Sequence, residues 1–363
     1  MRAKPLVLVV LGTRPEAIKL APVVAALRKI RGLECRVLST GQHRALLDRT
    51  LADLRLKVWK DLSLMRRDQA PGELAKRAFA ALLPVIERER PALVVVQGDT
   101  TTALAGALAA AHEDVPVGHV EAGVRSGDLS NPFPEEANRI VIDDLSALLF
   151  APTREAARRL RGAAGRVFVT GNTVVDALRS VAPRARARRG TKVVLVTMHR
   201  RESFEGGLAQ ACAAMRELLD RRPDVRIVFP VHLNPRVQKI VRAALRHPRA
   251  LLLPPLGYRA FVAELSRCRF VLTDSGGVQE EAASLGKPAL VLRRVTDRPE
   301  AVRAGVAVVT GLDPKMIVAR AERLLDDEKE YRRMTRRSSV FGDGRAGTRV
   351  AGQIRRFLRV KAP

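Results

Sequence analysis

Residues 6–30 read LVLVVLGTRPEAIKLAPVVAALRKI, and this stretch decides the fold class. The six apolar residues from Leu6 to Leu11 are typical of a buried strand, and the apolar spacing from Pro15 to Ile30 is typical of an amphipathic helix. Pro15 suits the first turn of that helix, because the N–H group that proline lacks would have no intrahelical partner there. The stretch therefore predicts a strand, a short turn and a helix, which form the first half of a βαβ unit.

The same alternation recurs along the chain. Helical patterns at Glu73–Glu89 and Thr101–His112 separate several of the apolar runs. Further strands are expected at Arg36–Ser39, Leu93–Gln97, Val117–Val120, Leu148–Ala151 and Val167–Thr170, and later at Val193–Thr197, Ile227–Val231, Leu251–Pro254, Phe270–Thr273, Ala289–Leu292 and Val306–Val309. Strands that alternate with helices at this spacing predict parallel sheets, so the fold class is α/β.

The alternation stops once, at residues 181–191, which are poor in large apolar side chains and favour a linker. We therefore expect an N-terminal domain at 1–180 and a C-terminal domain at 192–340, each a doubly wound, Rossmann-like parallel sheet. Residues 341–363 are expected to form a helix that packs back on the N-terminal domain. Two such domains would face each other across a ligand cleft at the carboxyl ends of their strands.

Composition limits the function classes. The chain has 363 residues, of which 47% are hydrophobic and 28% charged, so it is long enough for two buried cores and is not disordered. It contains neither an apolar stretch long enough to span a bilayer nor a recognisable signal segment, which predicts a cytoplasmic protein without a membrane partner. The three cysteines lie far apart, which argues against a disulfide framework and against a zinc site.

The net charge of +27 would ordinarily point to nucleic acid. However, residues 151–190 alone carry ten arginines against two acidic residues, scattered around apolar positions, and the C-terminal 30 residues are similar. Bases would also find few aromatic rings, since the chain has one Trp, two Tyr and ten Phe. We therefore expect a basic surface that attracts anionic metabolites, and no nucleic-acid partner.

Two turns between a strand and a helix suit an anion. Gly12–Glu16 offers free backbone N–H groups at a helix start together with the guanidinium of Arg14. Thr273–Glu281 places two glycines where the backbone can approach a phosphate, and Glu281 could accept hydrogen bonds from ribose hydroxyls. An ordinary βα turn and a plain capped helix are the competing interpretations. The second turn favours a nucleoside diphosphate.

Acidic residues follow two strands of the N-terminal domain. Asp99 and Glu121 end neighbouring runs, so both carboxylates should point to the same edge of the sheet, and a third acidic cluster lies at 134–139. Carboxylates held close together and away from water can exchange protons near neutral pH. Asp99 has an alternative role as the N-cap of the helix at Thr101–His112.

Histidines follow strands as well. His199, flanked by Arg200 and Arg201, ends the first strand of the C-terminal domain, where a ligand would bind. His232 has a similar place with weaker support, and His43 follows the second strand. The sequence contains neither a metal-ligand cluster nor a Gly-x-Gly-x-x-Gly fingerprint, so we expect no metal and no nicotinamide or other cofactor.

A set of motifs now resembles a known family, the non-hydrolysing UDP-N-acetylglucosamine 2-epimerases. The matching segments are GTRPEAIKLAPV (12–23), TGQHRALLD (40–48), GDTTT (98–102), VGHVEAGVRSGDLSNPFPEEANR (117–139), GNTVVDAL (171–178), VTMHRRESF (196–204), PVHLNP (230–235), DSGGVQEEAASLGKP (274–288), TDRPEAV (296–302) and FGDGRAG (341–347). They occur in order along the whole chain, which makes the resemblance specific.

The resemblance implies a two-domain fold of GT-B type, a homodimer, and a UDP-sugar substrate. It also implies interconversion of UDP-N-acetylglucosamine and UDP-N-acetylmannosamine, through anti elimination of UDP to 2-acetamidoglucal and re-addition. The matched positions imply three sets of residues. The catalytic set is Asp99, Glu121, Glu135 and His199; the substrate-binding set is Arg14, Lys19, Tyr258, Phe261, Ser275, Gly276, Gly277, Glu281 and Arg298; and a possible site for an activating second UDP-sugar is Gln42, His43, Arg201 and His232.

Small departures from the family pattern exist. Gln97 stands where His is common, Asp297 replaces a usual Glu, and Ala45 lies in the activator segment where a longer polar side chain is usual. The last departure puts activation by substrate in question. Four alternatives stay open: a glycosyltransferase of GT-B type that uses a UDP-sugar, a hydrolysing epimerase, an epimerase of a modified UDP-N-acetylglucosamine derivative, and a basic nucleic-acid-binding protein.

Overall fold

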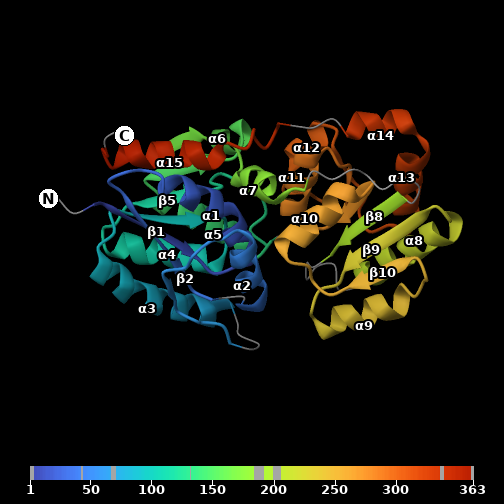
Figure 1. Ribbon diagram of the computed structural model, residues 1–363, viewed down its shortest axis with the longest axis horizontal. Helices are drawn as coiled ribbons and strands as arrows, with labels where there is room; N and C mark the ends of the chain where they lie inside the picture. Colours follow the sequence, from blue (N-terminus) through green and yellow to red (C-terminus); the bar gives the residue numbers. More distant parts are fainter. Residues whose placement is uncertain are drawn as a thin grey trace. The chain divides into compact units, whose positions relative to one another are not determined.

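The computed structural model describes residues 4–41, 44–66, 71–130, 132–183, 192–198, 206–335 and 339–360. The chain divides into two compact units (Figure 1). Unit 1 comprises residues 1–180 and 341–363, and unit 2 comprises residues 181–340. Helix α7 extends to Val181, so the predicted linker at 181–191 begins one residue too early, and its residues 184–191 lie outside the described part.

Unit 1 is built on a sheet of seven parallel strands in the order β3-β2-β1-β4-β5-β6-β7. The strands are β1 (Leu6–Leu11), β2 (Glu34–Ser39), β3 (Lys60–Asp61), β4 (Leu93–Gln97), β5 (Val117–Val120), β6 (Leu148–Ala151) and β7 (Arg166–Val169). All but β3 were predicted to within two residues at each end. The two residues of β3 are too few to produce a periodic pattern, which is why the sequence does not reveal this strand.

Helices cover both faces of the unit 1 sheet. The helices are α1 (Arg14–Leu27), α2 (Arg44–Asp53), α3 (Pro71–Glu89), α4 (Thr101–His112), α5 (Glu135–Leu145), α6 (Arg154–Arg159), α7 (Thr173–Val181) and α15 (Ala346–Phe357). Val9 points into a core formed with α1 and α15, while Val10 points into the opposite core with α3 and α4. Figure 1 shows α15 alongside α1, where a side chain at Gly347 would collide with the carbonyl of Pro22.

Unit 2 repeats this architecture with six parallel strands in the order β10-β9-β8-β11-β12-β13. The strands are β8 (Lys192–Thr197), β9 (Val225–Pro230), β10 (Ala250–Leu253), β11 (Phe270–Thr273), β12 (Ala289–Val291) and β13 (Ala307–Val309). The helices are α8 (Gly207–Arg221), α9 (Pro235–Ala244), α10 (Tyr258–Arg267), α11 (Gly276–Leu285), α12 (Pro299–Arg303), α13 (Pro314–Asp326) and α14 (Glu328–Met334). The predicted α/β fold class with two parallel sheets is therefore confirmed.

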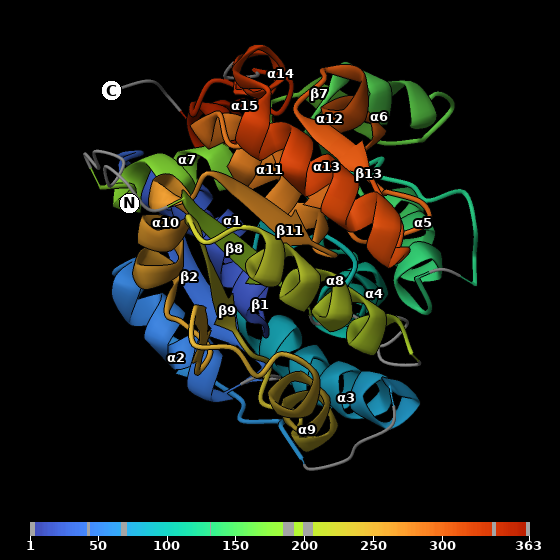
Figure 2. The ribbon, with the colours of Figure 1, turned by 90° about the vertical axis from the view of Figure 1, so that its right-hand side faces the viewer.

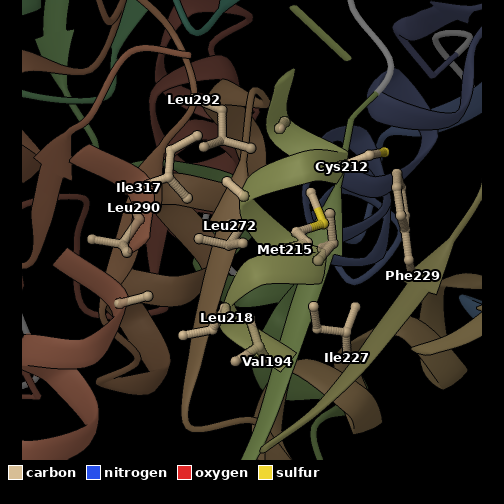
Figure 3. Packing of buried hydrophobic residues seen from close by; sticks show 14 of the residues in the cluster. Val194, Cys212, Met215, Leu218, Ile227, Phe229, Leu272, Leu290, Leu292 and Ile317 are labelled. Carbon is tan, nitrogen blue, oxygen red and sulfur yellow. The ribbon is translucent and has the colours of Figure 1, made fainter. Parts of the chain in front are cut away.

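The main core of unit 2 lies between its sheet and the pair α8 and α13, which run side by side (Figure 2). Met215 and Leu218 of α8 meet Val194, Ile227 and other strand residues there (Figure 3). Burying a side chain of this size stabilises the fold by about 1.5–3 kcal/mol. Helices α10 and α11 contact the strands β8, β11 and β12.

The strand order of each sheet reverses at one point, between β1 and β4 in unit 1 and between β8 and β11 in unit 2. Connections leave such a pair of strands in opposite directions, so a crevice opens at their carboxyl ends, and ligands of open α/β sheets bind there. The topology therefore directs attention to Gly12–Arg14 and Gly98–Asp99 in unit 1, and to Asp274–Gly277 in unit 2.

The turn between β1 and α1 is held by a buried carboxylate, Glu16. Its Oε2 accepts hydrogen bonds from the N–H of Gly12 (3.1 Å), from the N–H of Thr13 (2.8 Å) and from the hydroxyl of Thr13 (2.7 Å). Its Oε1 accepts one from the hydroxyl of Thr100 at 2.7 Å. This is a capping box that also ties the end of β1 to the loop after β4. Burial raises the pKa of Glu16 to about 7, although the four donors lower it.

This shift predicts a pH-dependent stability. Between the ordinary pKa of 4.5 and about 7, the folded protein keeps a proton on Glu16 that the unfolded chain has released. The folded state then binds more protons, so the free energy of unfolding falls as pH rises through this window and levels off above about pH 7, by an amount on the order of 3 kcal/mol. Glu16→Gln removes the titrating group, and chemical denaturation of this variant should show a flatter pH dependence. Glu73→Gln, which removes an exposed carboxylate of α3, should follow the wild type; equal slopes for all three proteins would contradict the prediction.

Candidate functional site

The end of β1 in unit 1 lies close to the start of α4. The hydroxyls of Thr40 and Thr102 share a hydrogen bond of 2.8 Å, and a side chain at Gly12 would collide with both oxygens. Glycine is therefore required at this position by close approach. Arg14, the first residue of α1, is half-buried two residues further on. The N–H groups of Gly12 and Thr13 are not the free donors that the sequence suggested, because Oε2 of Glu16 accepts from both.

Asp99 follows β4 and is held by α5. Its Oδ2 accepts hydrogen bonds from Arg139 Nε (2.8 Å) and Nη2 (2.5 Å), and its carbonyl accepts one from Asn138 Nδ2 (2.8 Å). The Asp99 side chain keeps 27% of its surface exposed, whereas that of Arg139 keeps only 6%. The alternative role of Asp99 as an N-cap is wrong, because the N-cap of α4 is Thr100, whose hydroxyl accepts from the N–H of Ala103 at 3.0 Å.

Glu121 follows β5, the strand next to β4, and its carboxylate is buried. Oε2 forms an ion pair with Lys19 of α1 and accepts a hydrogen bond of 2.8 Å from Gln97 Nε2. Its backbone has φ = 72°, a left-handed conformation that costs a residue other than glycine about 1–3 kcal/mol. Phe150 of β6 supports this conformation, since its carbonyl accepts from the N–H groups of both Glu121 (3.0 Å) and Ala122 (3.2 Å).

Glu135 is the first residue of α5. Asn138 and Arg139 lie three and four residues further along the same helix and both contact Asp99, so Glu135 lies on the helix face that meets the Asp99 loop. Within the described residues, Oε2 of Glu135 is buried without a hydrogen-bond partner. A buried polar atom of this kind is costly unless a further group binds it.

The adjacent Glu136 has a different role. It accepts hydrogen bonds from the N–H groups of Ser126 and Gly127 and from Arg139 Nη1. Burial alone would raise the pKa of Glu136, but these donors and the charge of Arg139 hold it below its ordinary value. Glu136 therefore shapes the loop before α5. The sequence pattern Glu-Glu does not reveal which of the two carboxylates is used in this way.

In unit 2, α11 begins directly after β11 with Ser275 at the N-cap position. The Ser275 hydroxyl makes no cap hydrogen bond within the described residues, so the helix start is not the plain capped one considered above. A side chain at Gly276 would lie 2.9 Å from Oδ1 of Asp297, whereas one at Gly277 would meet no described atom within 4 Å. The two glycines thus differ: the first permits close packing within unit 2, and the second leaves open space at the helix N-terminus.

Behind α11 lies a buried set of charges. Arg298 pairs with Glu280, and Arg293 Nη1 lies 3.2 Å from Oδ1 of Asp297. Glu281, which the sequence predicts as a ligand of ribose, is also buried, but it is the adjacent Glu280 that pairs with Arg298, a contact that the sequence does not reveal. The loop that carries Arg298 is held against α11 by a further hydrogen bond of 2.7 Å between Thr296 and Gln279.

The remaining predicted residues fall into three groups. Tyr258 and Phe261 of α10 are buried, with 1% and 6% of their surface exposed. His232 is exposed, and its Nδ1 accepts from the N–H of Asn234 at 3.2 Å. His199, Gln42, His43 and Arg201 lie outside the described residues.

Three or more His, Cys, Asp or Glu side chains are nowhere grouped in the described part of the chain so that they could hold a metal ion. Each helix that the structure describes is too short or too polar to cross a bilayer.

Comparisons with known proteins place these features in a family. Residues 25–355 match the family UDP-N-acetylglucosamine 2-epimerase. A UDP-N-acetylglucosamine 2-epimerase from Yersinia pestis is 44% identical over 363 residues, which cover 95% of this chain and 96% of that protein. Two solved structures are also similar, an S. aureus MnaA–UDP co-structure (TM-score 0.93, 39% identity, 99% of both chains) and the Neisseria meningitidis enzyme bound to UDP-GlcNAc (TM-score 0.92, 38% identity, 97% of this chain and 100% of that one). With such identity along almost its whole length, the chain belongs to the UDP-N-acetylglucosamine 2-epimerase family and is an isomerase.

Proposed function

We propose that this protein interconverts UDP-N-acetylglucosamine and UDP-N-acetylmannosamine by the non-hydrolysing route. The observation that supports the proposal is that Asp99 and Glu121 follow the neighbouring strands β4 and β5, and that α5, which begins at Glu135, contacts Asp99 through Arg139. The relatives in this family are named for the same activity, and the Neisseria meningitidis structure holds UDP-GlcNAc.

The chemistry requires such a set of carboxylates. The C2 proton of the sugar is not next to a carbonyl, so its removal needs a coupled driving force, which the departure of UDP from C1 supplies. A carboxylate takes the C2 proton, the electron pair of the C–H bond forms the C1–C2 double bond, and the C1–O bond breaks to release UDP and 2-acetamidoglucal. Re-addition of UDP at C1, with proton delivery to C2 from the opposite face by another acid, inverts that centre. No oxidant, reductant or metal takes part in this balance.

Cations and helix termini supply the other requirement, which is to hold the departing diphosphate. The first backbone N–H groups of α11, at Gly276 and Gly277, have no intrahelical partners, and the first turn of α1 carries Arg14. Arg298, Lys19, Gly276 and Glu281 complete the proposed substrate-binding set, with Tyr258 and Phe261 as the candidates for packing against uracil. His199 is proposed to act near the diphosphate during elimination.

The remaining parts of the proposal extend the family resemblance. We propose a homodimer in the cytoplasm, which light scattering and cell fractionation test. Gln42, His43, Arg201 and His232 are the candidate activator site, and a rate that rises when a second UDP-sugar is added at fixed substrate would support it.

Proton NMR of the purified protein with UDP-N-acetylglucosamine in D₂O tests the reaction directly. We expect UDP-N-acetylmannosamine with deuterium at C2 and no accumulation of free N-acetylmannosamine, because C2 is reprotonated from solvent while UDP is retained. Free N-acetylmannosamine and UDP would instead indicate the hydrolysing reaction. An unchanged spectrum would exclude this substrate and leave a modified UDP-sugar or glycosyl transfer to be tested.

The carboxylates should be individually required. Asp99→Asn, Glu121→Gln and Glu135→Gln each remove a proton-transfer group with little change of shape, so kcat should fall by about 10²–10⁴. The matched control is Asp128→Asn, which removes an exposed carboxylate from the loop that precedes α5. Steady-state kinetics of the four variants checks this prediction. If all three site variants keep kcat within a factor of about two, the assignment of proton transfer to these residues is wrong.

Gly277→Ala tests the diphosphate site in unit 2. The added methyl meets no described atom within 4 Å, and alanine favours helix by up to about 1 kcal/mol, so the free energy of unfolding should be equal or higher. The same methyl would occupy the space proposed for the diphosphate, so the dissociation constant of UDP should rise by about 10-fold or more. Gly352→Ala in α15 has equally open surroundings and should leave UDP binding unchanged. If calorimetry finds the same UDP affinity in both variants, the diphosphate does not bind at Gly277.

A further inference from the structure

His119 of β5 is fully buried, and both of its ring nitrogens meet oxygen atoms. Nδ1 lies 2.6 Å from Oδ1 of Asp143 on α5, and Nε2 lies 2.8 Å from the carbonyl oxygen of Gly98. Neither the reaction proposed above nor the motifs of the sequence analysis assign a task to this histidine. Its surroundings nevertheless determine its state and connect it to both strand-end carboxylates.

The partners of the ring determine its protons. A backbone carbonyl can only accept a hydrogen bond, so Nε2 must carry a proton. Oδ2 of Asp143 accepts from Arg125 Nη2 (2.6 Å) and from the N–H of Gly123 (3.1 Å), as an ionised carboxylate does. Nδ1 shares a second hydrogen bond with Oδ1 of Asp143, so both ring nitrogens are bound and the ring cannot turn without breaking a bond.

Through these contacts, the ring holds two loops. The Gly98 carbonyl immediately precedes Asp99, and the N–H of Gly98 donates to the carbonyl of Val120 at 3.0 Å. On the other side, Asp143 binds the N–H of Gly123, two residues after Glu121, whose left-handed backbone needs such support. The His119–Asp143 pair therefore contacts the backbone beside each carboxylate without touching either carboxylate group.

We propose that His119 is a positioning residue, held between the Gly98 carbonyl and Asp143, which fixes the directions in which Asp99 and Glu121 project. The proposal rests on the function proposed above, in which these carboxylates transfer protons. A displacement of about 1 Å in such a group is enough to reduce a rate by about 100-fold. The charged groups that face the ring are Asp143 from α5 and, through it, Arg125 from the loop after β5.

The first experiment addresses the hydrogen bonds of the ring without reference to activity. Nitrogen-15 NMR of the full chain with labelled histidine should show a proton on Nε2 of His119, as the Gly98 carbonyl requires, and Asp143→Asn should shift the Nδ1 signal because the partner of that nitrogen changes. Asp144→Asn, an exposed neighbour on the same helix, is the matched control and should leave the signal unchanged. A His119 ring without a proton on Nε2 would overturn the proposal, even if the protein proves to act on another substrate.

The second experiment addresses positioning. In His119→Asn, His119→Gln and Asp143→Asn, kcat should fall by about 10- to 100-fold while the dissociation constant of UDP stays within about twofold. The kinetic isotope effect with UDP-N-acetylglucosamine deuterated at C2 should rise, because the misdirected proton transfer becomes more rate-limiting. A smaller folded fraction would lower kcat but leave the isotope effect unchanged, and that outcome, or an unchanged kcat, would refute the positioning role. If the histidine variants do not fold, Asp143→Asn decides the question. Failure of the wild type to react with this substrate would refute the proposed function alone, since the hydrogen bonds of the ring are measured independently.

Discussion

The buried ion pair between Lys19 and Glu121 is the interaction on which the arrangement of unit 1 depends. Removing an ammonium and a carboxylate from water costs several kcal/mol per ion, and this cost is offset only when geometry and further hydrogen bonds are good. Gln97 Nε2 provides such a bond to the same carboxylate oxygen. The ion pair and this hydrogen bond together link three elements: α1 through Lys19, β4 through Gln97, and the end of β5 through Glu121. Because Lys19 and Arg14 share α1, the contact also sets the helix start relative to the carboxyl ends of β4 and β5.

A second feature of unit 1 is a strained backbone at Glu121 that the surrounding contacts hold in place. Glu121 has a left-handed backbone that is opposed by sterics and retained by the Phe150 carbonyl on one side and by Asp143, through Gly123, on the other. A strained backbone of this kind persists only where several surrounding contacts hold it in place. In unit 2, close packing is likewise set by specific residues. Gly276 permits the close approach of Asp297, and Arg298 forms an ion pair with Glu280 of α11.

The strands could be predicted because a parallel sheet buries both faces, which leaves nearly unbroken apolar runs such as Leu93–Gln97 in the sequence. The residues that follow the strands could be placed for the same reason, and so the positions of Asp99, Glu121 and Ser275 just after β4, β5 and β11 could be predicted. Their partners could not. Arg139, Asn138 and Asp143 lie on α5, where polar residues are expected on an exposed face, and only the tertiary fold turns them inward. Single-sequence patterns also cannot separate Glu135 from Glu136, or Glu280 from Glu281, since each pair has the same side chain and differs only in helix direction.

The large positive charge has a partly structural origin that composition alone conceals. Arg249 donates to the carbonyls of Leu219, Arg222 and Val225, at the C-terminal end of α8 and the start of β9, where the helix dipole favours a cation. Other arginines neutralise carboxylates inside the units, as Arg139 does for Asp99 and Arg298 for Glu280. An arginine engaged in this way directs its donors inward and offers little to a phosphate backbone. Pairs such as Arg139–Asp99 already cancel in the net charge of +27, so it is an arginine bound to carbonyls, as Arg249 is, that adds to this charge without offering its donors to a polyanion. A small anion at a helix N-terminus needs only local donors.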